Sequence, residues 1–272
     1  MRAEVMITDS HCHLASHRFS KTEIPELIDR AASAGIHRMV TLATCLEDVE
    51  DNLEISSRPE VRAALGIHPC DVHNAPDDAV AKLAPYMLDH RVCAVGETGL
   101  DYFHPAPEGW SEEDYRCRQR EFLKQHFQLA ADCGLNVVIH TRDKEGDASF
   151  ADALEIYRHF SNQVRAVFHC FISPWAKAEK VLLEGGLVSF GGVATFKKSE
   201  IIRDAVRQCP AGTFMLETDS PYLAPEPHRG KRNEPVFTQH IAKVIAEVRG
   251  ESIEELASHT EETVGNFFRW KK

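Results

Sequence analysis

Eight short apolar runs, separated by segments of mostly helical character, constrain the fold more than any other feature of this sequence. The runs are rich in Val, Ile, Leu and Phe and are often continuous, which is typical of parallel strands buried on both faces. Eight strand-then-helix units without a low-complexity linker predict an α/β fold of the (β/α)8 barrel type, the TIM barrel. The predicted strands are Met6–His13, Arg38–Thr44, Val61–His68, Val92–Gly99, Asn136–Thr141, Arg165–Cys170, Leu187–Val193 and Thr213–Asp219.

Amphipathic segments between these runs predict the helices. They include Ile24–Ala34, Ala79–Asp89, Tyr115–Cys133 and Ala176–Glu184, and the region Pro235–Trp270 predicts two more helices. The chain has 272 residues, a length that single barrels commonly reach. Because no shift in composition marks a boundary, we expect one hydrolase-type barrel domain over residues 1–272.

Polar residues follow the apolar stretch at the end of five of the eight predicted strands. Barrel enzymes carry their chemistry at the carboxyl ends of the strands. Any one of these residues could simply close a strand, but together they predict a cluster at one mouth of the barrel. His11 and His13 also share one face of their strand, because alternate side chains point the same way. The residues are His11, His13, Glu97, His140, His169 and Asp219.

Four histidines and two carboxylates exceed what one metal ion needs, because an open catalytic site takes about three protein ligands. Two divalent ions that share a bridging carboxylate would use all six residues. The mixed histidine and carboxylate set suits zinc, manganese, cobalt or nickel, whereas magnesium matches four imidazoles less well.

Net charge and cysteine pattern limit the function classes. With 31 basic and 42 acidic residues, the net charge of −11 argues against long, non-specific wrapping of DNA but permits cleavage at a metal site. The eight cysteines form no C-x-x-C pair, and Met1–Glu4 lead into a strand pattern without an export signal. We therefore expect reduced thiols, a cytoplasmic location, no membrane span and a monomer without an obligate protein partner.

The sequence resembles the TatD-related metal-dependent deoxyribonucleases, which have amidohydrolase-type barrels. The resemblance implies a (β/α)8 barrel and a two-metal site that activates water for hydrolysis of DNA phosphodiesters, expected as 3'-5' exonuclease action on single-stranded DNA. The matching stretches run in family order over nearly the whole chain: Asp9–Leu14, Gly66–Pro69, Val95–Tyr102, Ile139–Asp143, Phe168–Phe171, Val193–Lys197, Leu216–Pro225 and Pro227–Lys231.

The resemblance also implies a role for each matching residue. His11, His13 and Asp219 would hold one ion, His140 and His169 the other, and Glu97 would bridge them. Asp219 would orient the attacking water and take up its proton. His68 is expected to contact the substrate. Phosphate contacts are expected from Arg142, His228, Arg229 and Lys231, for which the alternative is ion pairs at the barrel rim.

Two segments depart from the family pattern, and two other functions stay open. His104–Glu113 is longer than the resemblance implies, and Lys144–Ser149 is slightly extended. The metal site alone would also suit hydrolysis of an ester, lactone or amide, including an aminoacyl-tRNA. A non-catalytic barrel is the other alternative, and the presence of all six ligand residues argues against it. Glu217 shares a strand face with Asp219 and is predicted to support a metal-bound histidine from one layer deeper.

Overall fold

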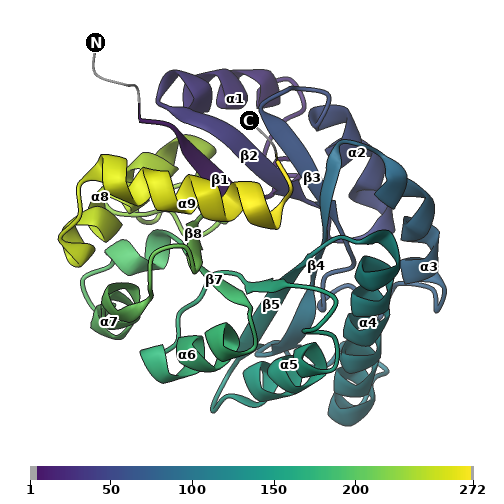
Figure 1. Cartoon of the computed structure of the whole chain (residues 1–272). Helices are drawn as coiled ribbons and strands as arrows, with labels where there is room; N and C mark the ends of the chain where they lie inside the picture. The colour runs from purple at the N-terminus through teal and green to yellow at the C-terminus, as the bar shows by residue number, and fades with distance from the viewer. Residues whose placement is uncertain (1–4, 271–272) are drawn as a thin grey trace.

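A computed structural model of the chain describes residues 5–270. Its eight parallel strands form one sheet, and their spatial order follows the chain order. Figure 1 shows the strands as an inner ring with the helices around it. The strands are β1 (Ile7–Cys12), β2 (Ile36–Leu42), β3 (Val61–Leu65), β4 (Val92–Tyr102), β5 (Val137–Asp143), β6 (Ala166–Phe168), β7 (Leu187–Phe190) and β8 (Phe214–Leu216).

The first strand also pairs with the residues that follow the last one, so the sheet curls round into a barrel. Cys12 forms a parallel bridge with Ser220. The Asp219 amide donates to the carbonyl of His11 at 2.9 Å, and the His13 amide donates to the carbonyl of Ser220 at 2.7 Å. The prediction of a (β/α)8 barrel is confirmed.

The helices follow the predicted segments with small changes at their ends. The segment Ala79–Asp89 differs, because Pro85 lacks an amide donor and the α-helix gives way to a 3-10 turn at Ala84–Leu88. The α-helices are α1 (Ile24–Ser33), α2 (Val49–Ile55), α3 (Ala79–Leu83), α4 (Glu112–Cys133), α5 (Ala148–Arg158), α6 (Trp175–Leu183), α7 (Glu200–Gln208), α8 (Thr238–Arg249) and α9 (Ile253–Phe267).

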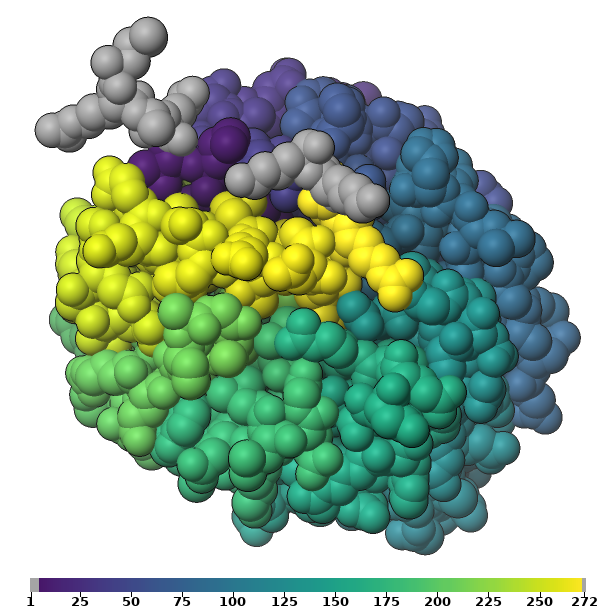
Figure 2. Space-filling model, viewed as in Figure 1, coloured from purple at the N-terminus to yellow at the C-terminus, as the bar shows by residue number. Residues whose placement is uncertain are grey.

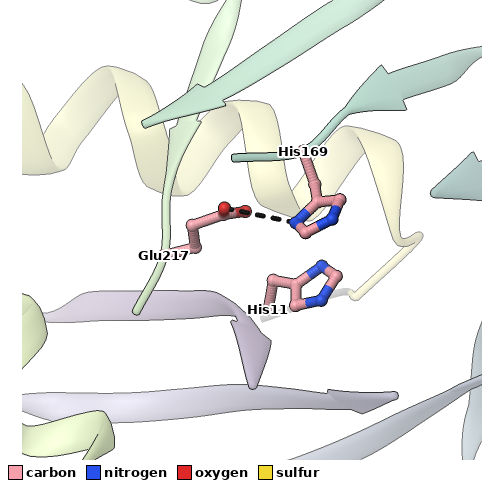
Figure 3. Close-up of side chains that lie close together, drawn as sticks. All are labelled: His11, His169 and Glu217. Atoms are coloured by element: carbon pink, nitrogen blue, oxygen red, sulfur yellow. Dashed lines mark ion pairs between the residues drawn. The ribbon is translucent and has the colours of Figure 1, made fainter. Parts of the chain in front are cut away.

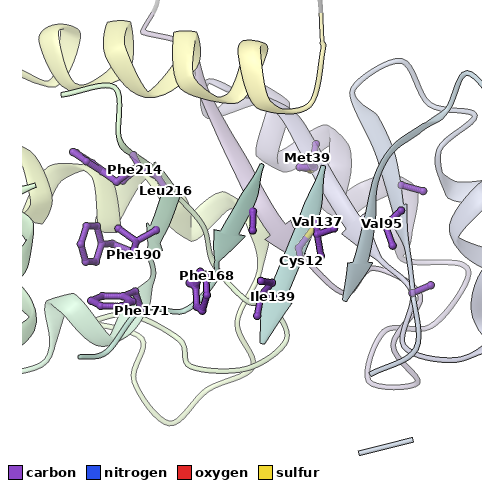
Figure 4. Close-up of a cluster of buried hydrophobic side chains, with 14 of the residues drawn as sticks. Cys12, Met39, Val95, Val137, Ile139, Phe168, Phe171, Phe190, Phe214 and Leu216 are labelled. Carbon is purple, nitrogen blue, oxygen red and sulfur yellow. The ribbon is translucent and has the colours of Figure 1, made fainter. Parts of the chain in front are cut away.

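The main core lies between the strands and the surrounding helices. It includes Phe168, Phe190 and Phe214, which come from three adjacent strands and are labelled in Figure 4. The rings of Phe190 and Phe214 lie edge to face, with centroids 5.6 Å apart. These side chains hold the sheet against the helices and so fix the positions of the strand ends.

A second buried cluster closes one end of the barrel. Val138 and Val167 lie two residues before His140 and His169, so they share the inner face of the barrel one layer lower. Phe267, Phe268 and Trp270, at the end of α9 and just beyond it, belong to the same cluster. Figure 2 shows the α8–α9 region, in yellow, lying across this face of the molecule. The polar strand ends therefore open at the other end.

The strand ladders stop at different heights around the barrel. β6 and β8 end before His169 and Glu217, whereas β4 and β5 continue to pair as far as Tyr102 and Asp143. The longer β4 brings Asp101 into the sheet opposite Arg142. The wall on this side thus rises above the predicted metal ligands.

No helix within residues 5–270 is long and apolar enough to cross a lipid bilayer. Met1–Glu4, on which the expectation about an export signal depends, lie outside the described residues.

Candidate metal centre

Glu97 lies at the centre of the polar cluster, and one of its carboxylate oxygens faces the histidines of β1. Its Oε2 atom lies 3.4 Å from His11 Nε2 and 3.3 Å from His13 Nε2. The two imidazole nitrogens are 3.2 Å apart. Asp219 Oδ1 completes this group, at 3.8 Å from His11 and 3.5 Å from His13.

The other oxygen of Glu97 faces a second pair of histidines. Glu97 Oε1 lies 2.8 Å from His169 Nε2 and 3.0 Å from His140 Nδ1. These two nitrogens are 3.3 Å apart. The six residues predicted from the strand ends are thus brought together, with one carboxylate between two groups of ligand-type atoms.

The spacing of these atoms fits metal coordination. Ligand atoms around a tetrahedral ion such as zinc, with bonds of about 2.0–2.1 Å, lie roughly 3.3 Å from one another. On the Oε2 side, the donor nitrogens of His11 and His13 lie 3.2–3.8 Å from each other and from the oxygens of Glu97 and Asp219. Those on the Oε1 side are 2.8–3.3 Å apart. The residues present therefore fit two divalent ions.

The second ring nitrogens of two histidines are oriented by acceptors outside the cluster. His140 Nε2 lies 3.1 Å from Asp101 Oδ2, and His13 Nδ1 lies 3.3 Å from the carbonyl oxygen of Leu42. Such contacts fix the tautomer and the ring orientation of a metal ligand. Sequence reasoning did not select Asp101. In a continuous strand, Asp101 would share a face with Glu97, and this could have identified it. The predicted strand ended at Gly99, so Asp101 fell outside it.

Glu217 lies beside His169 with its carboxylate directed toward the ring, as Figure 3 shows. Its Oε1 atom is 3.4 Å from His169 Nδ1, an ion-pair contact that is not aligned as a hydrogen bond. The Cys170 amide donates to the same oxygen at 2.7 Å, and the Ser189 hydroxyl donates to Oε2. The rings of His11 and His169 stack with centroids 3.8 Å apart. The Cys170 amide and the Ser189 hydroxyl therefore hold the Glu217 carboxylate in place. It lies next to His169, the metal-ligand type of residue that Glu217 is predicted to support.

A buried carboxyl group that sequence reasoning missed, Asp9, fixes the backbone before Asp219. The amide and the hydroxyl of Thr218 donate to its two oxygens at 2.8 and 2.6 Å. Burial raises the pKa of Asp9 to about 8, although these hydrogen bonds act in the opposite direction. Asp219 itself has φ 56°, a left-handed conformation that Asp tolerates better than most residues.

The charges in the cluster stabilise one another. Burial alone would raise the pKa of Glu97, but His169, His68 and His11 lower it well below its usual value. Burial alone would lower the pKa of His13, but hydrogen bonds to Asp219 and Glu97 raise it well above its usual value. The ionised carboxylates can form ion pairs with protonated histidines. When divalent metal ions bind in place of those protons, the same carboxylates can act as metal ligands.

The cluster forms the floor of a cavity of about 1050 Å³. His68 and Arg142, two of the predicted substrate contacts, line this cavity. His68 Nε2 lies 3.5 Å from Glu97 Oε1, and the Arg142 guanidinium packs on the ring of Phe103 at 4.0 Å. Both side chains can therefore reach a molecule bound above the metal ligands.

The other three predicted substrate contacts do not line this cavity. The ring of His228 stacks on Phe237 with centroids 4.1 Å apart. Arg229 packs over Phe196, which does line the cavity, and Lys231 is exposed. Arg229 and Lys231 thus lie outside the lining, and His228 packs toward α8.

Replacing Glu97 by Ala is expected to remove both ions, because each of its oxygens faces one of the two histidine groups. Elemental analysis should find about two fewer ions per chain in metal-loaded Glu97→Ala than in the metal-loaded wild-type protein. A matched Glu108→Ala change, at an exposed position, should keep both. A wild-type value that stays at one ion or fewer under saturating metal would contradict the two-metal arrangement.

Comparison with known proteins agrees with this geometry. Residues 8–269 match the family model described as TatD related DNase. The chain is 34% identical over 268 residues to the uncharacterized metal-dependent hydrolase YcfH of Escherichia coli (strain K12), covering 97% of this chain and 96% of that one. It is 30% identical over 253 residues to the 3'-5' ssDNA/RNA exonuclease TatD of Cronobacter sakazakii, covering 89% and 90%.

A solved structure supports the same relationship. The TatD homologue YJJV from Escherichia coli superposes with a TM-score of 0.85 and 26% identity, over 97% of this chain and 98% of that chain. A phosphotriesterase homology protein from the same organism, complexed with phosphate, is 13% identical with a TM-score of 0.63 and so shares the fold alone. The family model, the relatives and the histidine–carboxylate cluster agree that this chain belongs to the TatD-related DNase family of metal-dependent hydrolases.

Proposed function

We propose that this protein cleaves phosphodiester bonds of single-stranded DNA, removing nucleotides from the 3' end. The observation that carries the proposal is the position of Glu97 between two groups of metal-ligand atoms. Paired ions of this kind suit in-line displacement at phosphorus, because attacking and leaving oxygens are both stabilised. The name of the Cronobacter sakazakii relative, 3'-5' ssDNA/RNA exonuclease TatD, supports this choice of substrate and direction.

The protein side chains would divide the work of the reaction. Divalent ions, when bound by the His11 and His140 groups, would supply Lewis-acid polarisation of the phosphoryl oxygens and acidify water. Asp219 is the proposed general base, because its carboxylate borders the open cavity. Burial alone would raise the pKa of Asp219, but His13 and the neighbouring histidines lower it, so the carboxylate is ionised at neutral pH.

His68 is suited to donate a hydrogen bond to the substrate. The Cys70 amide donates to His68 Nδ1 at 3.1 Å, so that nitrogen carries no proton. In the neutral ring the proton then lies on Nε2, which faces the cavity beside Glu97. His68 Nε2 and the Arg142 guanidinium are the proposed donors to phosphate oxygens.

The direct test is digestion of single-stranded DNA labelled at its 5' end, with and without divalent metal. We expect a metal-dependent ladder of products that shorten one nucleotide at a time. Parallel reactions with RNA, small esters and an aminoacyl-RNA define the substrate class. Turnover of the esters or the aminoacyl-RNA, with intact DNA, would replace this proposal with the alternative hydrolase function.

DNA binding should depend only weakly on salt, because the net charge of −11 repels a long polyanion. Each phosphate neutralised on a single strand contributes a slope of about −0.7 to log K against log salt, so about three contacts give roughly −2. Binding of a labelled oligonucleotide by Asp219→Asn, in which cleavage is expected to be slow, measures this slope. A slope of roughly −6 or steeper would indicate an extended basic groove and contradict the prediction.

A further inference from the structure

A second group of ligand-type side chains lies at the rim of the same cavity. It consists of Cys70, from the segment after β3, Asp101, in β4, and His104, just beyond β4. His104 Nδ1 lies 3.0 Å from Asp101 Oδ2 and 3.7 Å from Cys70 Sγ. The three ligand atoms all lie within 4.8 Å of one another. β3 and β4 are adjacent strands of the barrel (Figure 1), so the three side chains converge from neighbouring parts of one wall.

Hydrogen bonds hold Asp101 in a fixed orientation. Its side chain is 1% exposed, and its Oδ1 atom accepts from the amides of Phe103 and His104 at 3.0 and 2.9 Å. The Gln119 side chain, from α4, pairs with both the amide and the carbonyl of Asp101. These contacts leave Oδ2 directed toward His104 and His140.

The backbone beside Cys70 is also fixed. The Tyr115 hydroxyl, from α4, donates to the carbonyl of Pro69 at 3.1 Å, and the Cys70 amide donates to His68 Nδ1. His104 is 48% exposed, so the group can be reached from solvent. The cluster therefore combines two well-anchored ligands with one accessible imidazole.

The ligand types indicate which ion would bind. Zinc in proteins is bound by three types of side-chain ligand, namely thiolate, imidazole and carboxylate. Magnesium and calcium, in contrast, prefer oxygen ligands alone. With zinc bonds of about 2.0–2.3 Å, tetrahedral ligand atoms lie roughly 3.2–3.7 Å apart, close to the 3.0 and 3.7 Å that separate His104 Nδ1 from Asp101 and Cys70. Three ligands would leave a fourth position open to water or a phosphate oxygen.

We propose that Cys70, Asp101 and His104 form a third metal site, for zinc or a similar borderline-soft divalent ion, separate from the centre at Glu97. Binding displaces the thiol proton of Cys70 to solvent, because the thiolate is the ligand. The ion would add positive charge at the mouth of a cavity in a protein of net charge −11. It would also share Asp101 Oδ2 with His140, which links the rim to the main centre.

Cobalt substitution tests this site, because cobalt bound to a thiolate absorbs in the near ultraviolet through sulfur-to-metal charge transfer. The proposed ligands of the Glu97 centre include no cysteine, so the band reports the rim site alone. The wild-type protein, kept reduced and loaded with cobalt, should show the band. Cys70→Ser should lose it together with about one equivalent of bound cobalt. The readout is independent of nuclease activity, so it stands whether or not DNA is the substrate.

Two further variants sharpen the experiment. Cys170 lines the same cavity, so Cys170→Ser is the matched thiol control and should keep the band. His104→Ala changes an exposed side chain, so the variant should stay folded. Its cobalt affinity, measured by titration of the charge-transfer band, should be weaker than that of the wild type by roughly tenfold or more. No band in the wild-type protein, a band that persists in Cys70→Ser, or a band lost in Cys170→Ser alone would overturn the proposal. Thermal melting of each variant checks the fold.

Discussion

Replacing Asp219 by Asn is expected to give a folded protein that has lost most of its kcat, by roughly a hundredfold to ten-thousandfold. The amide is neutral, accepts a proton poorly and is a weaker metal ligand than the carboxylate. The position tolerates Asn sterically, because Asn also adopts the left-handed conformation that Asp219 has at φ 56°. Single-turnover kinetics on one oligonucleotide, with thermal melting as a check on folding, measure the effect.

Glu217→Gln is the matched comparison, because Glu217 lies two residues away on the same side of the barrel. We expect a smaller loss of kcat, since an amide oxygen can still accept from the Cys170 amide or the Ser189 hydroxyl. Its contact with His169, at 3.4 Å, is an ion-pair contact without an aligned hydrogen bond. If Glu217→Gln stays folded and loses more activity than Asp219→Asn, the roles of the two carboxylates are reversed.

Phe267→Ala is expected to lower the free energy of unfolding by about 3–5 kcal/mol, which is typical for removal of a buried phenyl ring. Phe267 is 1% exposed in the cluster that closes the barrel, and its ring lies edge to face against Phe268. Urea denaturation, followed by circular dichroism, measures the change through the midpoint and the slope.

Phe103→Ala provides the control for that experiment. Phe103 is 39% exposed and contacts the Arg142 guanidinium, so its removal should change the unfolding free energy by less than about 1 kcal/mol. A loss below about 1 kcal/mol for Phe267→Ala would mean that the end of α9 does not support the barrel interior.

The barrel and the six clustered residues could be predicted because both depend on local pattern. An apolar run followed by His140 or His169 places a polar group at the end of a strand, and this prediction does not depend on the neighbouring strands. Eight such runs in series leave few arrangements other than a barrel. The residues then converge because parallel strands end on the same side.

The supporting groups could not be predicted in the same way, because they depend on tertiary contacts. Asp101 faces His140 only because the β4–β5 ladder continues beyond Glu97. Asp9 reaches Thr218 across the closure of the barrel, 209 residues later in the chain. His228 belongs to a loop, and its stacking on Phe237 could not be inferred from local sequence.

The closed end of the barrel has a consequence for synthesis on the ribosome. The layer beneath the polar cluster includes Val138 and Val167, yet it is completed by Phe267, Phe268 and Trp270. Translation delivers the chain from its amino end, so all eight strands emerge before these three residues do. Until then the inner apolar positions, such as Val138 and Val167, lack the side chains that cover them in the folded protein. Translation pauses between β8 and α9 would therefore prolong the exposure of this apolar layer, and exposed apolar surface favours aggregation.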